Sequence, residues 1–175
     1  MIVVSDTTPL RYLIEIDQVH IIAALFGTVF IPEKVAAELQ HAKTPQKVKD
    51  WMQARPAWLE VHTANLSLFT PQRQLHAGER EAFALALELQ AQAVLLDDRK
   101  AMPEAHRLKL QTIALFTLLE IAATRNLLDL PLAVDAMRQT TFRLPPEPAI
   151  QAMLARDAAC QQAQKTPEPE QESLS

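Results

Sequence analysis

Short apolar runs alternate along this chain with longer segments in which apolar residues recur every three or four positions. Two parallel strands need a crossover between them, usually a helix, whereas antiparallel strands can be joined by a tight turn. The alternation is therefore typical of βαβ units, and it predicts an α/β fold around a parallel sheet. The predicted strands are residues 2–5, 28–31, 59–61, 93–96 and 111–114.

Helical periodicity fills the segments between these strands. Thr8 followed by Pro9 predicts a helix start in which the threonine hydroxyl is the N-cap and proline occupies the first turn. Asp6 would then be free of any capping role. The predicted helices are residues 10–16, 19–26, 33–40, 46–54, 79–90, 100–108, 116–125, 132–138 and 149–164.

The length of 175 residues and the hydrophobic content of 49% fit one domain with a single core. We expect this domain at residues 1–145, followed by a C-terminal helix at 146–164. Residues 165–175 are acidic and contain two prolines, and they have too little apolar content to fold alone. We expect them to form a disordered tail.

Composition excludes several classes of protein. The formal net charge of -4 argues against a broad basic surface for duplex binding, although a local basic strip remains open. Cys160 is the only cysteine, which excludes an internal disulfide and a cysteine-rich zinc site and fits a reducing cytoplasm. No apolar stretch reaches the length of about 18 residues that a membrane span requires, so we expect no membrane association. With two glycines, the chain lacks a glycine-rich phosphate loop.

Acidic residues occur where separate elements begin or end. Asp6 follows the first strand, Glu38 lies in the helix after the second, Glu81 lies in the helix at 79–90, and Asp97 follows the strand at 93–96. Carboxylates that converge from different elements repel one another unless a hard cation neutralises them. The pattern therefore indicates a metal-dependent hydrolytic site.

Each of these acids also has a structural interpretation. Asp6 could be a turn residue that bonds its own backbone, and Glu38 could be a solvated residue at the edge of its helix. Glu79 and Glu81 point in nearly opposite directions on their helix, so only one can face the site. We expect this to be Glu81, with Glu79 stabilising the helix N-terminus through the dipole.

Asp97 and Asp98 are adjacent, and one of them could cap the following helix. Capping is the expected role of Asp98, which leaves Asp97 as the better candidate for a metal ligand. Arg99 and Lys100 come next in the chain, where cations would suit a phosphodiester substrate or could be ordinary surface charges.

Taken in order, these motifs resemble the PIN-domain family of nucleases, which includes the VapC-type toxins of bacterial toxin–antitoxin pairs, and they are most similar to an uncharacterised PIN branch. The resemblance covers roughly residues 1–145. It rests on Ser5-Asp6-Thr7-Thr8-Pro9-Leu10, Ile31-Pro32 with Glu38, Gly78-Glu79-Arg80-Glu81-Ala82 and Leu95-Leu96-Asp97-Asp98-Arg99.

The resemblance implies a three-layer α/β/α sandwich and a ribonuclease that uses Mg²⁺ or Mn²⁺ to hydrolyse RNA. It also implies a role as the toxin of a type II pair, with a small antitoxin protein as partner, and leaves a homodimer open. A catalytically silent PIN-fold module that binds protein or RNA is the alternative, and a DNA-directed nuclease is a weaker one. The implied catalytic residues are Asp6, Glu38, Glu81 and Asp97; the metal ligands are these four and Asp98; the substrate contacts are Thr7, Thr8, Arg99 and Lys100.

Overall fold

The computed structural model describes residues 1–165 and contains one five-stranded sheet. The strand order is β3-β2-β1-β4-β5, and every neighbouring pair is parallel. This arrangement confirms the predicted α/β fold. The strands are β1 Val3–Ser5, β2 Val29–Pro32, β3 Leu59–His62, β4 Ala93–Leu95 and β5 Thr112–Ile113.

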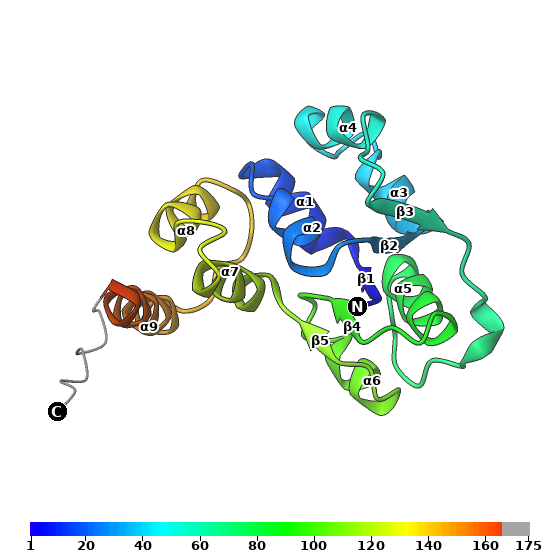
Figure 1. Cartoon of the computed structure of the whole chain (residues 1–175). Coiled ribbons are helices and arrows are strands. Elements are labelled where there is room, and N and C mark those ends of the chain that lie inside the picture. The colour runs from blue at the N-terminus through cyan, green and yellow to red at the C-terminus, as the bar shows by residue number, and fades with distance from the viewer. Residues whose placement is uncertain (166–175) are drawn as a thin grey trace, which may run out of the picture.

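Helices cover both faces of the sheet and make it a three-layer sandwich (Figure 1). Successive residues of a strand point to opposite faces, so Val3 and Val4 belong to different clusters. Val3 faces α1 Thr7–Glu15, α2 His20–Phe26 and α7 Leu115–Thr124. Val4 faces α5 Ala77–Glu88 and α6 Met102–Arg107.

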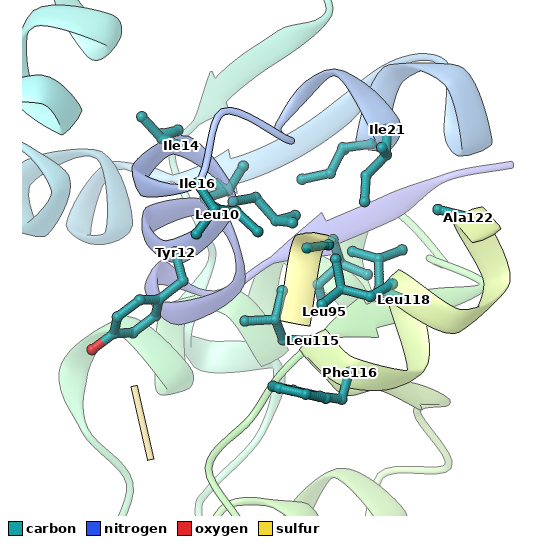
Figure 2. Packing of buried hydrophobic residues seen from close by; sticks show 14 of the residues in the cluster. Leu10, Tyr12, Ile14, Ile16, Ile21, Leu95, Leu115, Phe116, Leu118 and Ala122 are labelled. Atoms are coloured by element: carbon teal, nitrogen blue, oxygen red, sulfur yellow. The ribbon is translucent and has the colours of Figure 1, made fainter. Parts of the chain in front are cut away.

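The larger cluster fills the space between α1, α2, α7 and the sheet, as Figure 2 shows. Leu10 of α1, Leu95 of β4 and Leu118 of α7 have no exposed surface. Each fully buried side chain of this size contributes about 1.5–3 kcal/mol. This packing fixes the N-terminal end of α1, and with it the residue that follows β1.

The remaining helices lie around this sandwich. The helix α3 Glu33–Leu39 packs against α1 and α5, and α4 Gln46–Gln53 packs against α1 and α3. A short 3₁₀ helix, η1 Leu66–Leu68, packs against α5. The helices α8 Leu130–Arg138 and α9 Glu147–Lys165 both pack against α7, on its side away from the sheet (Figure 1).

All the predicted strands and helices are present, with ends that differ from the predicted ones by up to three residues. Two shifts matter for the site: α1 begins at Thr7 with Asp6 as its N-cap, and α5 begins at Ala77. Of the expected tail, residues 166–175 lie outside the described part of the chain. Within residues 1–165, no helix is both long and apolar enough to cross a membrane.

Candidate metal centre

A cavity of about 330 Å³ lies beyond the carboxyl ends of the central strands. Residues that follow β1 and β4 meet there with residues from α3 and from the start of α5, which is where open α/β sheets bind ligands. The cavity is lined by Asp6, Thr7, Thr8, Glu38, His76, Gly78, Glu79 and Asp98. We call it the acidic pocket.

Asp6 is an almost fully buried carboxylate of the acidic pocket, with 6% of its surface exposed. It occupies the N-cap position expected for Thr8, so that expectation is wrong, although its side chain makes no capping hydrogen bond of standard geometry. The pKa of Asp6 is raised from 3.8 to about 7, chiefly by burial and also by the charges of Glu79 and Glu38, while the N–H groups of Thr7 and Thr8 lower it. Asp6 therefore favours a proton or a cation beside it.

Glu38 reaches the acidic pocket from the last turn of α3. Its Oε2 accepts a hydrogen bond of 2.5 Å from Oγ1 of Thr7, which fixes the carboxylate next to the start of α1. Gly78 makes this approach possible. A Cβ atom on Gly78 would lie 2.9 Å from Oε2 of Glu38 and 3.3 Å from Oδ1 of Asp6. A side chain at this position would push the carboxylates apart.

Glu79 lies in the first turn of α5 and is 5% exposed. Its Oε2 accepts a hydrogen bond of 2.8 Å from the backbone N–H of His76, the N-cap residue of this helix. Burial raises the pKa of Glu79, and it is raised further by the negative charge of Asp98 and by a hydrogen bond that protonated Glu79 donates to the Asp98 carboxylate, while the N–H of His76 lowers it. One ligand atom each of His76, Glu79 and Asp98 lies within 4.8 Å of the other two, a separation that one metal ion could bridge.

The orientation expected for Glu81 and Glu79 is reversed. Oε2 of Glu81 accepts the backbone N–H of Lys34 at 2.9 Å and so satisfies a donor in the first turn of α3. Glu81 does not line the acidic pocket. Because α5 begins at Ala77, Glu79 falls at the third helical position, where its side chain turns back toward the N-cap and into the pocket.

The structural roles expected for Asp97 and Asp98 are likewise exchanged. Both carboxylate oxygens of Asp97 lie 3.1 Å from the backbone nitrogen of Leu115, the first residue of α7. Burial raises the pKa of Asp97 to about 6 despite this donor. Asp98 instead lines the acidic pocket, and its Oδ1 accepts the N–H of Lys100 at 2.7 Å within the turn before α6.

Arg99 and Lys100 do not line the acidic pocket but a second cavity, of about 680 Å³, beside it. The two cavities share Thr8 and Asp98. The other residues that line the second cavity are Tyr12, Asp97, Thr141, Phe142, Arg143, Leu144 and Pro146. We call this larger space the cationic cavity.

The acidic pocket suits a divalent metal ion. Four carboxylates, of Asp6, Glu38, Glu79 and Asp98, surround it, and within residues 1–165 no lysine or arginine lines it. Two of these carboxylates, those of Asp6 and Glu79, are almost fully buried, and burial shifts both toward the protonated form. Carboxylate oxygens are the donors that Mg²⁺ and Mn²⁺ prefer, so the residues fit such an ion.

Sequence reasoning gave no role to His76 or Gly78. The spacing of His76 and Glu79, three residues apart before an apolar helix, is that of a capping box and could have indicated that Glu79 turns inward. Gly78 lies in the helical first turn, where glycine is unfavourable unless close approach requires it.

One of three comparisons with known proteins gives a match. A family model described as a PIN domain matches residues 2–156, which is most of the chain. No curated protein and no solved structure gives a match to the chain.

Proposed function

Because the chain belongs to the PIN-domain family, whose members are generally nucleases, we propose that it is a metal-dependent endoribonuclease. The observation that carries this proposal is the convergence of Asp6, Glu38, Glu79 and Asp98 on one pocket from four different elements. Repulsion among these carboxylates destabilises the folded protein, and a bound cation would neutralise that repulsion. RNA is the substrate that the proposal assigns.

Asp6, Glu38, Glu79 and Asp98 would hold Mg²⁺ or Mn²⁺. A bound ion of this kind lowers the pKa of water and stabilises negative charge on the phosphate and on the leaving oxygen. Thr7 orients Glu38 through its hydroxyl, and the N–H of His76 orients Glu79. These hydrogen bonds hold the carboxylates in place before any ion arrives, so that less reorganisation is needed on binding.

The imidazole of His76 lies close to Glu79 and Asp98 and could complete the ligand set. Imidazole nitrogen is a better donor for Mn²⁺ than for Mg²⁺. Mn²⁺ should therefore bind more tightly than Mg²⁺, and a His76→Ala variant should reduce that difference. Isothermal titration calorimetry of Mn²⁺ and Mg²⁺ with the wild type and with His76→Ala measures this difference in affinity.

The test of the nuclease is cleavage of a labelled single-stranded RNA by the purified protein. Cleavage should require Mg²⁺ or Mn²⁺, stop with EDTA and be lost in Asp6→Asn, while a deoxyribose oligomer of the same sequence should be cut more slowly. Cleavage that persists in Asp6→Asn would point to a contaminating nuclease. If the pure protein binds Mn²⁺ and RNA yet cleaves neither oligomer, the chain is a silent binding module.

We further propose that the protein acts in the cytoplasm as the toxin of a type II pair. A ribonuclease active on cellular RNA needs restraint, and a partner arginine or lysine can block a carboxylate pocket by replacing the charge of the metal. The antitoxin would be a small protein that inserts such a side chain beside Asp6. Induced expression should stop growth, and co-expression of the antitoxin should restore it; harmless expression of an active nuclease would remove the toxin role alone.

A further inference from the structure

We propose that the cationic cavity binds the RNA chain next to the scissile phosphodiester, with Arg143 contacting a backbone phosphate. This inference rests on the proposed nuclease function and extends it to a substrate-binding residue. Arg143 lies more than forty positions beyond Asp98 in the sequence, and the fold brings both to the wall of one cavity.

The size and position of the cationic cavity suit part of a nucleic-acid chain. Its volume of about 680 Å³ lies within the range of roughly 300–1,000 Å³ typical of ligand sites. It shares Thr8 and Asp98 with the acidic pocket, so a chain held at the metal centre continues directly into it. A polymer substrate must leave the acidic pocket on each side, and this cavity offers one such path.

Three cations gather at the cationic cavity. Arg99, Lys100 and Arg143 are exposed, and among residues 1–165 none of their side chains forms an ion pair. By contrast, Arg138 and Arg156 both pair with glutamates. The whole chain carries a net charge of -4, so it would repel RNA without a local group of positive charges. The three cations supply that attraction beside the acidic pocket.

Arg143 lies in the segment 139–146 between α8 and α9, and contacts hold this segment at its middle and at its ends. The ring of Phe142 packs edge-on against Tyr12 with centroids 5.0 Å apart and stacks on Phe116 at 5.8 Å. The Tyr12 hydroxyl lies 3.1 Å from Oγ1 of Thr141.

At its two ends the segment is closed by an ion pair. Arg138, the last residue of α8, contacts both carboxylate oxygens of Glu147, the first residue of α9, at 2.9 and 3.0 Å. The backbone that carries Arg143 is therefore positioned before RNA binds, which lowers the cost of ordering on binding.

A guanidinium group pairs with a carboxylate as readily as with a phosphate, so an acidic peptide is the rival ligand. The carboxylates of Asp97 and Asp98, which line the same cavity, favour RNA over an acidic peptide. An acidic peptide would place its charges beside those of Asp97 and Asp98, whereas an RNA chain can place the neighbouring phosphate on the metal ion. RNA is therefore the ligand that both cavities accommodate together.

The test measures RNA binding without cleavage. In a Glu38→Gln background, fluorescence anisotropy follows a labelled single-stranded oligoribonucleotide in the presence of Mn²⁺ over a range of salt concentrations. Arg143→Ala should weaken binding about tenfold, which is the loss expected for one charged hydrogen bond. The slope of log affinity against log salt should fall by about 0.7, as expected for one contact to a single strand.

Arg125→Ala is the matched control. Arg125 is also exposed, but it follows the C-terminal end of α7 and does not line the cationic cavity. Arg125→Ala should leave RNA affinity and salt slope unchanged, and neither variant should change the melting temperature or the affinity for Mn²⁺. Unchanged RNA binding in Arg143→Ala, beside normal cleavage by the wild type, would overturn this inference and leave the nuclease intact.

Two other results would also overturn the inference. If Arg143→Ala weakens Mn²⁺ binding, the residue acts through the metal centre and not through RNA. If the variant loses binding of a polyglutamate peptide but not of RNA, the cavity belongs to an acidic partner. Absence of both RNA binding and RNA cleavage in the wild type would instead refute the nuclease together with this extension.

Discussion

Replacing Asp6 with asparagine should stabilise the protein when no divalent metal is present. Asp6 is 6% exposed, and the folded structure raises its pKa from 3.8 to about 7. At pH 8, where Asp6 is ionised in both states, this rise lowers the free energy of unfolding by about 4 kcal/mol. Asparagine removes the charge but also the favourable electrostatic interaction with the nearby N–H groups of Thr7 and Thr8. We expect Asp6→Asn to gain about 2–4 kcal/mol at pH 8.

The pH dependence of this gain follows from the sign of the shift. Between pH 4 and 7 Asp6 is protonated in the folded state and ionised in the unfolded state, so folding takes up a proton there. The Asp6 contribution to stability therefore falls as pH rises through this window and is constant above it. The advantage of Asp6→Asn should be largest at pH 8 and should become small near pH 4, where the unfolded wild type also starts to be protonated.

The assay is thermal unfolding followed by circular dichroism in EDTA from pH 4 to 8. For a domain of this size, a gain of 2–4 kcal/mol raises the melting temperature by about 5–12 °C. Asp50→Asn is the control, because Asp50 is exposed and accepts only a side-chain hydrogen bond from Gln46; it should change little. A less stable Asp6→Asn at pH 8 in EDTA would refute the reasoning, because it would mean that the charge is already compensated.

Three further substitutions separate the acidic pocket from its surroundings. Gly78→Ala should lower Mn²⁺ affinity at least tenfold in calorimetry, because the new Cβ would lie 2.9 Å from Oε2 of Glu38, and an unchanged affinity would mean that α5 can move away. Asp97→Ala should leave Mn²⁺ affinity unchanged, because Asp97 accepts the N–H of Leu115 and does not line the acidic pocket; a loss of metal binding would return Asp97 to the ligand set. Phe142→Ala should weaken RNA binding without affecting Mn²⁺ binding, and equal RNA affinity would show that the rings of Phe142 and Tyr12 do not hold the cavity wall.

The strands and helices could be predicted from the sequence because local patterns determine them. The first strand is apolar and β-branched, and it ends at an acid followed by Thr-Thr-Pro. Such a sequence can hardly continue as a strand, and the structure has β1 ending at Ser5 and α1 beginning at Thr7. The parallel sheet followed from the helical lengths between the strands.

The direction of individual carboxylates could not be predicted in the same way. The α5 helix is apolar on almost every side, so its periodicity does not distinguish the face toward the sheet from the face toward α3. A shift of two residues in its start decided whether Glu79 or Glu81 entered the acidic pocket. Glu81 and Glu88 of this helix instead accept the backbone N–H groups of Lys34 and Asn65.

Asp97 and Asp98 were ambiguous for a different reason. Adjacent residues at a strand end point to opposite sides, and the choice between them depends on where the strand stops. The prediction extended the strand to Leu96, whereas β4 ends at Leu95. The partner of Asp97 is the N-terminus of α7, which is distant in sequence and could not be identified from local patterns.

Mn²⁺ binding to Glu79→Gln and Glu81→Gln tests the central claim most directly. The two glutamates are two positions apart on one helix, and both changes remove one charge while keeping the size of the side chain. Calorimetric titration should show that Glu79→Gln loses Mn²⁺ affinity by at least tenfold and that Glu81→Gln binds like the wild type. Equal loss in both variants, or a loss confined to Glu81→Gln, would contradict a metal centre built from Asp6, Glu38, Glu79 and Asp98.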